Sequence, residues 1–161
     1  MPQPMEQTFI ADCMLGKLAR WLRIIGCDTE YFPAIGDAEL VERGARTGRL
    51  ILTRDTLLIR RRKARANHLF IHSDHFRDQL RQVVRDLSLD PFARFLSRCI
   101  ECNDQLRPIE KTKLARSIPD YVHMTHDRFS TCPSCRRIYW EGTQRERMME
   151  ELRHILESPL P

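Results

Sequence analysis

The first 90 residues alternate between short runs typical of β-strands and longer runs typical of helices. Strand-like runs cover residues 8–11, 29–32, 50–53 and 69–71. Helix-like runs cover residues 15–25, 37–47, 57–65 and 80–87. Strands that alternate with helices favour a mostly parallel sheet with right-handed crossovers. We therefore expect an α/β fold with a mostly parallel sheet.

The pattern changes after Asp90 and Pro91. Helical periodicity fades there, and cysteines and prolines appear. A charged, methionine-rich segment at residues 144–156 then has the composition of a closing helix. The sequence therefore predicts two domains, one over residues 1–90 and a second over residues 91–161 that ends in this helix.

Three aspartates stand where strand-like and helix-like runs meet. Asp12 follows the first strand-like run, Asp55 follows the third, and Asp37 opens the second helix-like run. In an open α/β sheet, ligands bind beyond the carboxyl ends of the strands. Carboxylates gathered there repel one another unless they share a hard cation such as Mg²⁺ or Mn²⁺, which can activate water and stabilise a phosphodiester under attack. Each aspartate alone can equally cap a helix or a turn, but their recurrence at one kind of junction favours a metal site.

Four cysteines form the most specific pattern in the chain. They stand as two Cys-x-x-Cys pairs, Cys99 with Cys102 and Cys132 with Cys135. Two such pairs present four thiolates to a tetrahedral ion, which is the arrangement of structural zinc, and they leave no open position for chemistry. The alternative is two redox-active or unpaired dithiols.

The spacer between the two pairs runs from residue 103 to residue 131, which is 29 residues. This exceeds the usual spacing of about 15–20 residues, and we expect an extended hairpin to absorb the extra length. Asn103 tolerates the left-handed turn that often follows such a pair, whereas Arg136 is less suited to it. His123 and His126 are expected to be loop residues rather than ligands.

Two other cysteines, Cys13 and Cys27, are expected to pack as small hydrophobic side chains. Trp21 is likewise expected in the core. The first eight residues have neither the basic nor the apolar region of a secretion leader. Cysteines in such a chain favour metal ligation over disulfides, and we expect a reducing, cytoplasmic location. No apolar stretch approaches the roughly 18 residues that a membrane span requires.

The formal net charge of +5 favours a polyanionic partner, because Lys and Arg neutralise phosphates in nucleic-acid complexes. Lys17, Arg20 and Arg23 recur every third residue, opposite the leucine stripe of the first helix-like run. A denser basic cluster consists of Arg54, Arg60, Arg61, Arg62, Lys63 and Arg65. Either group can instead be a solvated helix face. For the dense cluster we favour phosphate contacts, since five of these charges fall within six residues.

Missing motifs exclude several enzyme classes. The sequence contains no GxxxxGK[ST] phosphate-binding loop, no GxGxxG after a strand and no GxSxG turn. The histidines do not suggest a catalytic triad or the histidine pair of a cyclising ribonuclease.

Several motifs together resemble the Mut-seven C-terminal ribonuclease family, over about residues 9–142. They are Asp12-Cys-Met-Leu-Gly-Lys-Leu-Ala-Arg-Trp-Leu-Arg-Ile-Ile-Gly, Gly36-Asp-Ala-Glu-Leu, Leu52-Thr-Arg-Asp55, Ser97-Arg-Cys-Ile-Glu-Cys-Asn and Cys132-Pro-Ser-Cys-Arg-Arg-Ile-Tyr-Trp. The resemblance implies a PIN-like domain, with three α/β/α layers, joined to a C-terminal zinc ribbon. The family pattern leads us to expect glycine after the last cysteine, where this chain has Arg136.

The resemblance also implies roles for the acids. Asp12 matches the first-strand acid of PIN-like nucleases, Asp37 their helix acid, and Asp55 the acid of their Thr-x-Asp element. Asp74, after the fourth strand-like run, is a candidate fourth carboxylate and alternatively the N-cap of the next helix. Asp12, Asp37 and Asp55 would hold one or two Mg²⁺ or Mn²⁺ ions.

The sequence therefore predicts a metal-dependent ribonuclease that hydrolyses RNA phosphodiester bonds, with a structural zinc ribbon that assists RNA binding. Lys17, Arg20 and Arg54 would neutralise phosphate near the cut, and the basic residues 60–65 would carry the flanking RNA backbone. The main alternative is a non-catalytic RNA- or ribosome-binding protein with an idle PIN-like domain. A protein-interaction adaptor or toxin-like partner is a third class. The oligomeric state stays open.

Overall fold

The computed structural model describes residues 6–159. The absence of a secretion leader was inferred partly from residues 1–5, which lie outside this range. The helices and strands, with η for short 3₁₀ helices, are β1 (Phe9–Ala11), η1 (Cys13–Leu15), α1 (Gly16–Ile24), β2 (Thr29–Tyr31), α2 (Asp37–Thr47), β3 (Leu50–Thr53), η2 (Leu58–Arg60), α3 (Arg62–Arg65), β4 (His68–Phe70), α4 (Phe76–Asp86), β5 (Arg107–Ile109), η3 (Lys111–Leu114), α5 (Asp120–Thr125), β6 (Phe129–Thr131), β7 (Ile138–Trp140) and α6 (Thr143–Glu157).

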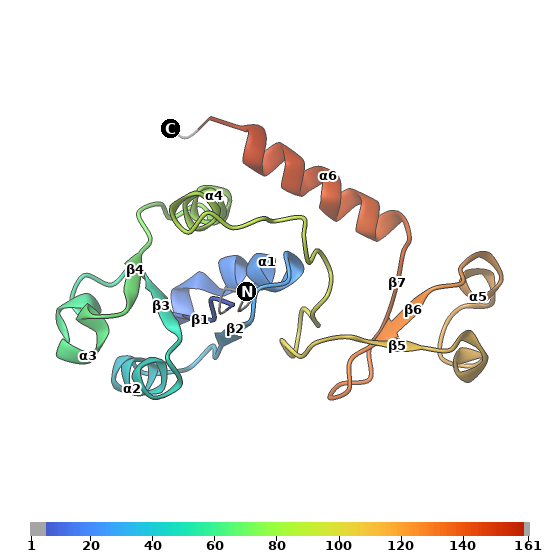
Figure 1. The fold of residues 1–161 in the computed structure, drawn as a ribbon, viewed down its shortest axis with the longest axis horizontal. Coiled ribbons are helices and arrows are strands. Elements are labelled where there is room, and N and C mark those ends of the chain that lie inside the picture. Colours follow the sequence, from blue (N-terminus) through green and yellow to red (C-terminus); the bar gives the residue numbers. More distant parts are fainter. Residues whose placement is uncertain (1–5, 160–161) are drawn as a thin grey trace, which may run out of the picture.

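The first half is built on a four-stranded parallel sheet with the strand order β2-β1-β3-β4. Helices α1 and α4 cover one face, while α2 and α3 cover the other (Figure 1). Alternate side chains of β1 supply the two cores, because Phe9 packs with α1 and Ile10 packs with Leu40 of α2. Strands buried on both faces need nearly continuous apolar runs, which is the pattern of β1 and β3. The expected α/β fold with a parallel sheet is confirmed.

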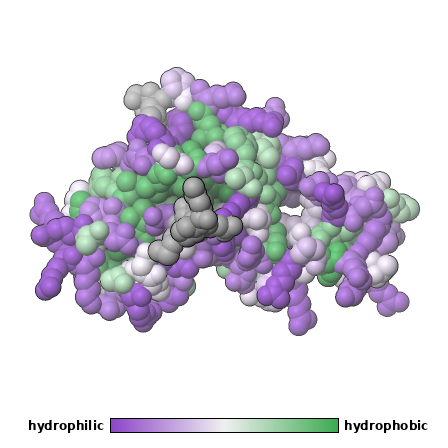
Figure 2. Space-filling view, in the orientation of Figure 1, coloured by the Kyte–Doolittle hydropathy of each residue, from purple (hydrophilic) through white to green (hydrophobic). Residues whose placement is uncertain are grey.

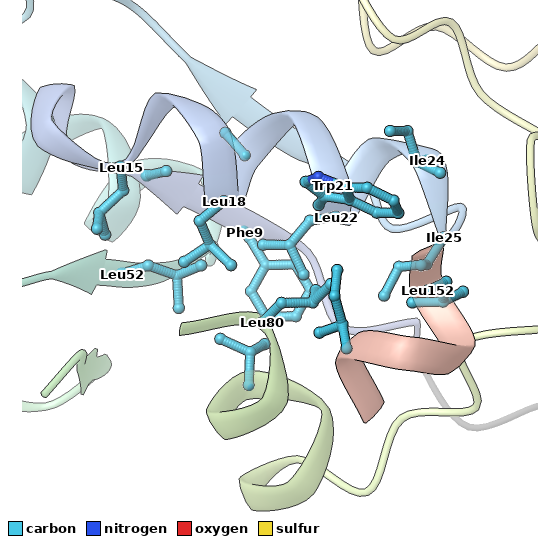
Figure 3. Packing of buried hydrophobic residues seen from close by; sticks show 14 of the residues in the cluster. Phe9, Leu15, Leu18, Trp21, Leu22, Ile24, Ile25, Leu52, Leu80 and Leu152 are labelled. Atoms are coloured by element: carbon cyan, nitrogen blue, oxygen red, sulfur yellow. The ribbon is translucent and has the colours of Figure 1, made fainter. Parts of the chain in front are cut away.

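The larger core lies between the sheet, α1 and α4. Phe9, Leu18, Leu22, Leu52 and Leu80 are all fully buried and converge there (Figure 3). Burying one such side chain typically contributes about 1.5–3 kcal/mol relative to leaving it exposed. Trp21 also belongs to this core, as expected.

Helix α6 returns from the second half of the chain to this same core. Its Leu152 and Ile155 are buried among the side chains of α1 and α4. At its end, Arg81 of α4 donates hydrogen bonds to the carbonyl oxygens of Ile155, at 3.2 Å, and Ser158, at 2.8 Å. The closing helix is thus confirmed, and it packs against the first half rather than standing apart.

The surface divides accordingly. Figure 2 shows hydrophilic atoms over both ends of the molecule and a hydrophobic band between them, where Figure 1 places α4 and α6. Within residues 6–159, no helix combines the length and the apolar character needed to cross a membrane.

The second half contains a three-stranded antiparallel sheet in the order β5-β6-β7. The spacer between the cysteine pairs does form an antiparallel hairpin of β5 and β6, but η3 and α5, rather than extended strands, take up its extra length. Leu114, Ile118 and Val122 bury their side chains with Phe129 in a small separate core. These apolar residues explain why the spacer folds as short helices.

One continuous helix over residues 57–65 is also not observed. The segment forms η2 and α3, which are separated at Arg61, where φ is −65° and ψ is 135°. Leu58 and Ala64, on either side of this break, are both buried against α2 and β3. The basic side chains therefore surround two short helices rather than one face of a long helix.

Candidate active site and metal centre

Asp12 and Asp55 follow the neighbouring strands β1 and β3 at their carboxyl ends. The backbone N–H of Asp12 donates to the carbonyl oxygen of Leu52, at 2.9 Å, and so continues the strand pairing. Beyond this point the chain after β1 turns to the α1 face of the sheet, whereas the chain after β3 turns to the α3 face. This divergence is the topological switch point at which open α/β sheets bind their ligands.

One hydroxyl group links the two acids. Thr53 Oγ1 donates a hydrogen bond to Oδ2 of Asp12, at 2.8 Å, and accepts one from the backbone N–H of Asp55, at 3.0 Å. Thr53 is fully buried and Asp12 is only 4% exposed. Thr53 thus positions the Asp12 carboxylate and the turn that carries Asp55. Sequence reasoning did not count it as a site residue, although its place two residues before Asp55 was visible.

Asp55 has a second structural role. Its Oδ1 accepts hydrogen bonds from the backbone N–H groups of Leu57, at 2.7 Å, and Leu58, at 3.2 Å. This is the turn-forming contact expected of an aspartate at such a junction. The structure therefore supports the capping interpretation for this residue, which does not exclude a ligand role for its carboxylate.

Asp37 and Asp74 lie at or just before the starts of two helices, α2 and α4. Asp37 is the first residue of α2, and its Oδ2 lies 4.0 Å from Nη2 of Arg61. Asp74 precedes α4 with a side chain that is 77% exposed, and His75 Nε2 lies 3.5 Å from its Oδ1. The N-cap of α4 is His75 and has no side-chain cap, so the structure does not show Asp74 in the capping role.

Cys13 reaches the same carboxylates. A hydrogen bond to Asp12 raises the pKa of the Cys13 thiol, and burial and the charges of Asp12 and Asp37 raise it further. Cys13 is exposed, so the expectation that it packs as a small hydrophobic residue is wrong, whereas half-buried Cys27 does pack against the larger core. Tyr31 Oη donates to the carbonyl oxygen of Cys13, at 2.8 Å. A Cβ at Gly16 would lie 2.8 Å from Tyr31 Oη, so this approach requires glycine.

In the described residues, no three of the four acids lie close enough together to share one metal ion. Among residues 6–159, the four cysteines are the one group of three or more potential ligands close enough to share a metal. Asp12, Asp37, Asp55 and Asp74 lie at one edge of the sheet without forming such a group. Their assignment as ligands stays a prediction.

The four cysteines fit a tetrahedral metal. Their sulfur atoms all lie within 4.8 Å of one another, and Sγ of Cys99 is 3.7 Å from Sγ of Cys135. A zinc ion with Zn–S bonds of about 2.3 Å requires sulfur atoms roughly 3.8 Å apart. The group can therefore hold a metal such as zinc.

The two cysteine pairs form matching turns. The N–H of Asn103 donates to Cys99 O, and the N–H of Arg136 donates to Cys132 O, both at 2.9 Å. Both turn residues are left-handed, with φ of 68° at Asn103 and 60° at Arg136. The left-handed turn thus forms at Arg136 as well, although that residue suits it less than glycine. The backbone N–H of Arg137 lowers the pKa of Cys135 to about 7, whereas a hydrogen bond with Cys135 raises the pKa of Cys102 and burial raises that of Cys132.

Comparison with known protein families assigns the chain to one of them. The model of the Mut7-C RNAse domain matches residues 7–152. The chain belongs to the Mut7-C RNAse domain family. Comparisons with the curated proteins and with the solved structures gave no match. Membership points to a ribonuclease in general, which implies an RNA substrate.

In this Mut7-C chain, the basic residues of α1 have three different environments. Lys17 is exposed, and its Nζ lies 5.7 Å from the ring centre of Phe76. Arg20 pairs with Glu101 at 3.1 Å. Arg23 is only 9% exposed, so its expected place on a free RNA-binding face does not fit the structure.

Arg23 instead joins the two halves of the Mut7-C chain. Its guanidinium donates to the carbonyl oxygens of Thr29, at 2.9 Å, Ile100, at 3.0 Å, and Glu101, at 2.9 Å. Asn103 adds two contacts, because its Oδ1 accepts from the N–H of Thr29 and its Nδ2 donates to Asp28. The first cysteine turn is therefore bonded to α1 and to the start of β2. Sequence periodicity does not show the contacts between the halves, since those partners are more than 70 residues apart.

Part of the second basic cluster is paired within the chain, and Arg65 Nη2 also donates to the carbonyl oxygen of Arg60, at 3.0 Å. Arg54 Nη1 donates to His72 O, at 3.0 Å, Arg61 lies near Asp37, and Lys63 pairs with Glu42 at 2.5 Å. Within the described range, no carboxylate pairs with the remaining arginines of the cluster, which are Arg60, Arg62 and Arg65. Their guanidinium groups are available to an anionic ligand.

Proposed function

We infer that this chain is a divalent-metal-dependent ribonuclease with a PIN-like domain, whose site lies at the carboxyl ends of β1 and β3. One observation carries the proposal. At the switch point of a sheet in a Mut7-C RNAse domain, a buried threonine hydroxyl binds Asp12 and the N–H of Asp55. A buried carboxylate needs such a partner, because desolvation of a lone charge is costly.

The donor set at this edge suits Mg²⁺ or Mn²⁺. Asp12, Asp37 and Asp55 offer carboxylate oxygens, which hard cations prefer. When bound, such an ion neutralises charge on the phosphodiester and lowers the pKa of water at the site. Asp37 is 44% exposed, so its side chain has room to turn toward Asp12.

Other residues of the chain bind and orient the RNA in this proposal. Lys17 and Arg54 flank the acidic edge and neutralise phosphates next to the cut. Arg60, Arg62 and Arg65 contact the flanking backbone. Cys13 and Thr53 hold Asp12 in place, while Asp74 stays a candidate fourth ligand.

The proposal includes a structural zinc ribbon. Cys99, Cys102, Cys132 and Cys135 hold the ion, and the hydroxyl of Tyr139 lies 3.2 Å from Sγ of Cys99. Such outer contacts orient metal ligands. The ribbon then presents its own basic side chains to the RNA that the first half cuts.

Cleavage of an end-labelled RNA tests the proposal. Activity should require added Mg²⁺ or Mn²⁺ and leave 5′-phosphate and 3′-hydroxyl ends. Asp12→Asn should abolish cleavage and leave RNA affinity unchanged or higher, because a negative charge near phosphate is removed. Asp127→Asn is the matched control, since the Asp127 side chain is 93% exposed in the ribbon. Metal-independent cleavage with cyclic phosphate ends, or full activity in the Asp12→Asn protein, would show that the chemistry lies elsewhere.

A second candidate is an RNA- or ribosome-binding protein without catalysis. It is favoured by the separation of the four acids and by the turn-forming role of Asp55. The same experiment distinguishes it, because salt-sensitive RNA affinity with no cleavage in either metal supports binding alone.

A further inference from the structure

A pocket of about 310 Å³ lies between the two halves of the molecule. Its walls come from α1, from the first cysteine turn, from α5, and from the junction of β7 with α6. Its volume reaches the range of small-molecule and cofactor sites, which starts at about 300 Å³. The acidic edge does not contribute to it, so the pocket is a separate site.

The polar side chains of this pocket favour an anion. Arg20, Arg137 and Arg145 line it together with a single carboxylate, Glu101. Glu101 Oε1 lies 3.1 Å from Arg20 Nη1 and 3.8 Å from Arg137 Nη1, and so holds two arginines from opposite halves of the chain near one point. A guanidinium has five N–H donors, and these two side chains are 52% and 58% exposed. Both retain donors for a phosphate.

The pocket also contains aromatic surface. Tyr121 of α5 is 62% exposed, although its neighbour Val122 is buried in the ribbon core. Trp140 of β7 lines the same pocket. Aromatic side chains beside arginines are the combination with which proteins hold unpaired bases, because every base can stack on an aromatic ring.

Helix α1 connects this pocket with the acidic edge. Lys17 lines a second pocket, next to Met14 and Asp74, whereas Arg20 lines the pocket between the halves. Residues three apart on a helix have Cβ atoms about 5–6 Å apart on one face. The two cations therefore mark a path along α1 that begins close to Asp12.

We propose that the pocket between the halves holds one nucleotide of a single-stranded RNA, with its phosphate on Arg20 and Arg137 and its base against Tyr121 and Trp140. This inference rests on the proposed ribonuclease function and names its substrate class. Bases within a duplex are stacked and paired, so a duplex cannot place one in the pocket. The strand runs from the pocket along α1 to the acidic edge.

Binding measurements without added divalent metal test this independently of cleavage. Affinity for a fluorescein-labelled single-stranded oligoribonucleotide is compared with affinity for an abasic version and for a duplex. Tyr121→Ala should weaken single-strand binding about tenfold, as expected for the loss of one stacked base. It should leave binding of the abasic strand and the duplex unchanged. Arg137→Ala should weaken binding of both single strands.

Matched control variants are Met124→Ala, which is 75% exposed on the same short helix, and Arg116→Ala, which lies elsewhere in the ribbon. Zinc content and circular dichroism verify that each variant folds. Equal affinities in Tyr121→Ala and Met124→Ala proteins would overturn the inference, as would equal losses for single strand and duplex. If RNA is cleaved but Tyr121→Ala changes no affinity, only the pocket assignment fails. If Tyr121→Ala weakens binding but no metal supports cleavage, only the catalytic proposal fails.

Discussion

The hydroxyl of Thr53 donates a hydrogen bond of 2.8 Å to the carboxylate of Asp12. Because Thr53 is fully buried and also accepts the N–H of Asp55, it fixes the relative placement of the ends of β1 and β3. A side chain that only positions an acid has a testable signature, since its removal changes how the acid holds metal.

Thr53→Val should lower the cleavage rate about tenfold to a hundredfold, the effect typical of losing a hydrogen bond that orients a metal ligand. It should also raise the Mg²⁺ concentration that gives half-maximal activity, because Asp12 loses its orienting donor. A metal titration of the cleavage rate measures both, with the exposed Thr112→Val as control. An unchanged Mg²⁺ midpoint would argue against the positioning role.

Cys102→Ser should lose the zinc and unfold mainly the region after Pro91, because ligand loss removes folding free energy. The unchanged protein should contain about one zinc per chain, as expected for one four-cysteine site. Elemental analysis and hydrogen exchange measure the two effects. Cys13→Ser is the control, since Cys13 lies at the other end of α1 and should keep the metal. Protein purified without chelator that contains no zinc would contradict the assignment.

Arg23→Ala should destabilise the fold by about 3 kcal/mol, because two buried carbonyl oxygens and one part-buried carbonyl oxygen lose a charged donor. Urea unfolding measures the change. The salt dependence of RNA binding should stay the same, since Arg23 is not on the surface. If the Arg23→Ala protein had normal stability and a reduced salt dependence of RNA binding, Arg23 would instead be an RNA-binding residue.

Joint replacement of Arg60, Arg62 and Arg65 by alanine should reduce the slope of log affinity against log salt concentration by about two. Each lost contact with single-stranded RNA reduces this slope by roughly 0.7. Stability should change little, because these side chains are exposed. Titrations at several salt concentrations measure the slope. A slope equal to that of the unchanged protein would mean that the cluster is only a solvated surface.

Acid should weaken the contact between the cysteine turn and β2. Burial alone would raise the pKa of Asp28, but hydrogen bonds from Arg49 and Asn103 outweigh it and lower the pKa. Because the folded pKa is below the unfolded one, this stabilisation is present above the unfolded pKa of about 3.9. It is lost as the pH falls through the folded value.

Asp28→Asn should therefore show a shallower loss of stability below about pH 4 than the unchanged protein, since only the charged form gains from these partners. Urea midpoints between pH 2.5 and pH 7 measure the difference. Zinc release in acid affects both proteins and cancels in the comparison. Identical pH profiles would show that Asp28 contributes nothing to acid sensitivity.

Local patterns in the sequence predicted the sheet well. Residues 9–11 and 50–53 are short apolar runs of the kind that is buried between two layers of helices. Gly26, just after α1, has a left-handed backbone with φ of 90°. The cysteine pairs were equally informative, because metal geometry dictates their spacing. In both cases the information lies within a few neighbouring residues.

Long-range contacts were not predictable in this way. Arg23 has the spacing of a surface residue on α1, yet it is buried because the backbone at residues 100 and 101 lies over it. Cys13 is exposed for a related reason, since it lies at the acidic edge rather than under a helix. The spacer between the cysteine pairs forms short helices because Leu114 and Val122 both pack against Phe129. Each outcome depends on a partner that local periodicity does not reveal.

Helix α1 starts four residues after Asp12 and ends next to the contacts of Arg23 with the first cysteine turn. This single helix of nine residues thus connects the acidic edge with the cysteine centre. Metal bound by the cysteines would therefore act on the alignment of the acids through this one helix. In a newly synthesised chain without zinc, the first cysteine turn would not be in place to bind the C-terminal end of this helix. Ribonuclease activity would therefore appear only after the cysteines have bound metal.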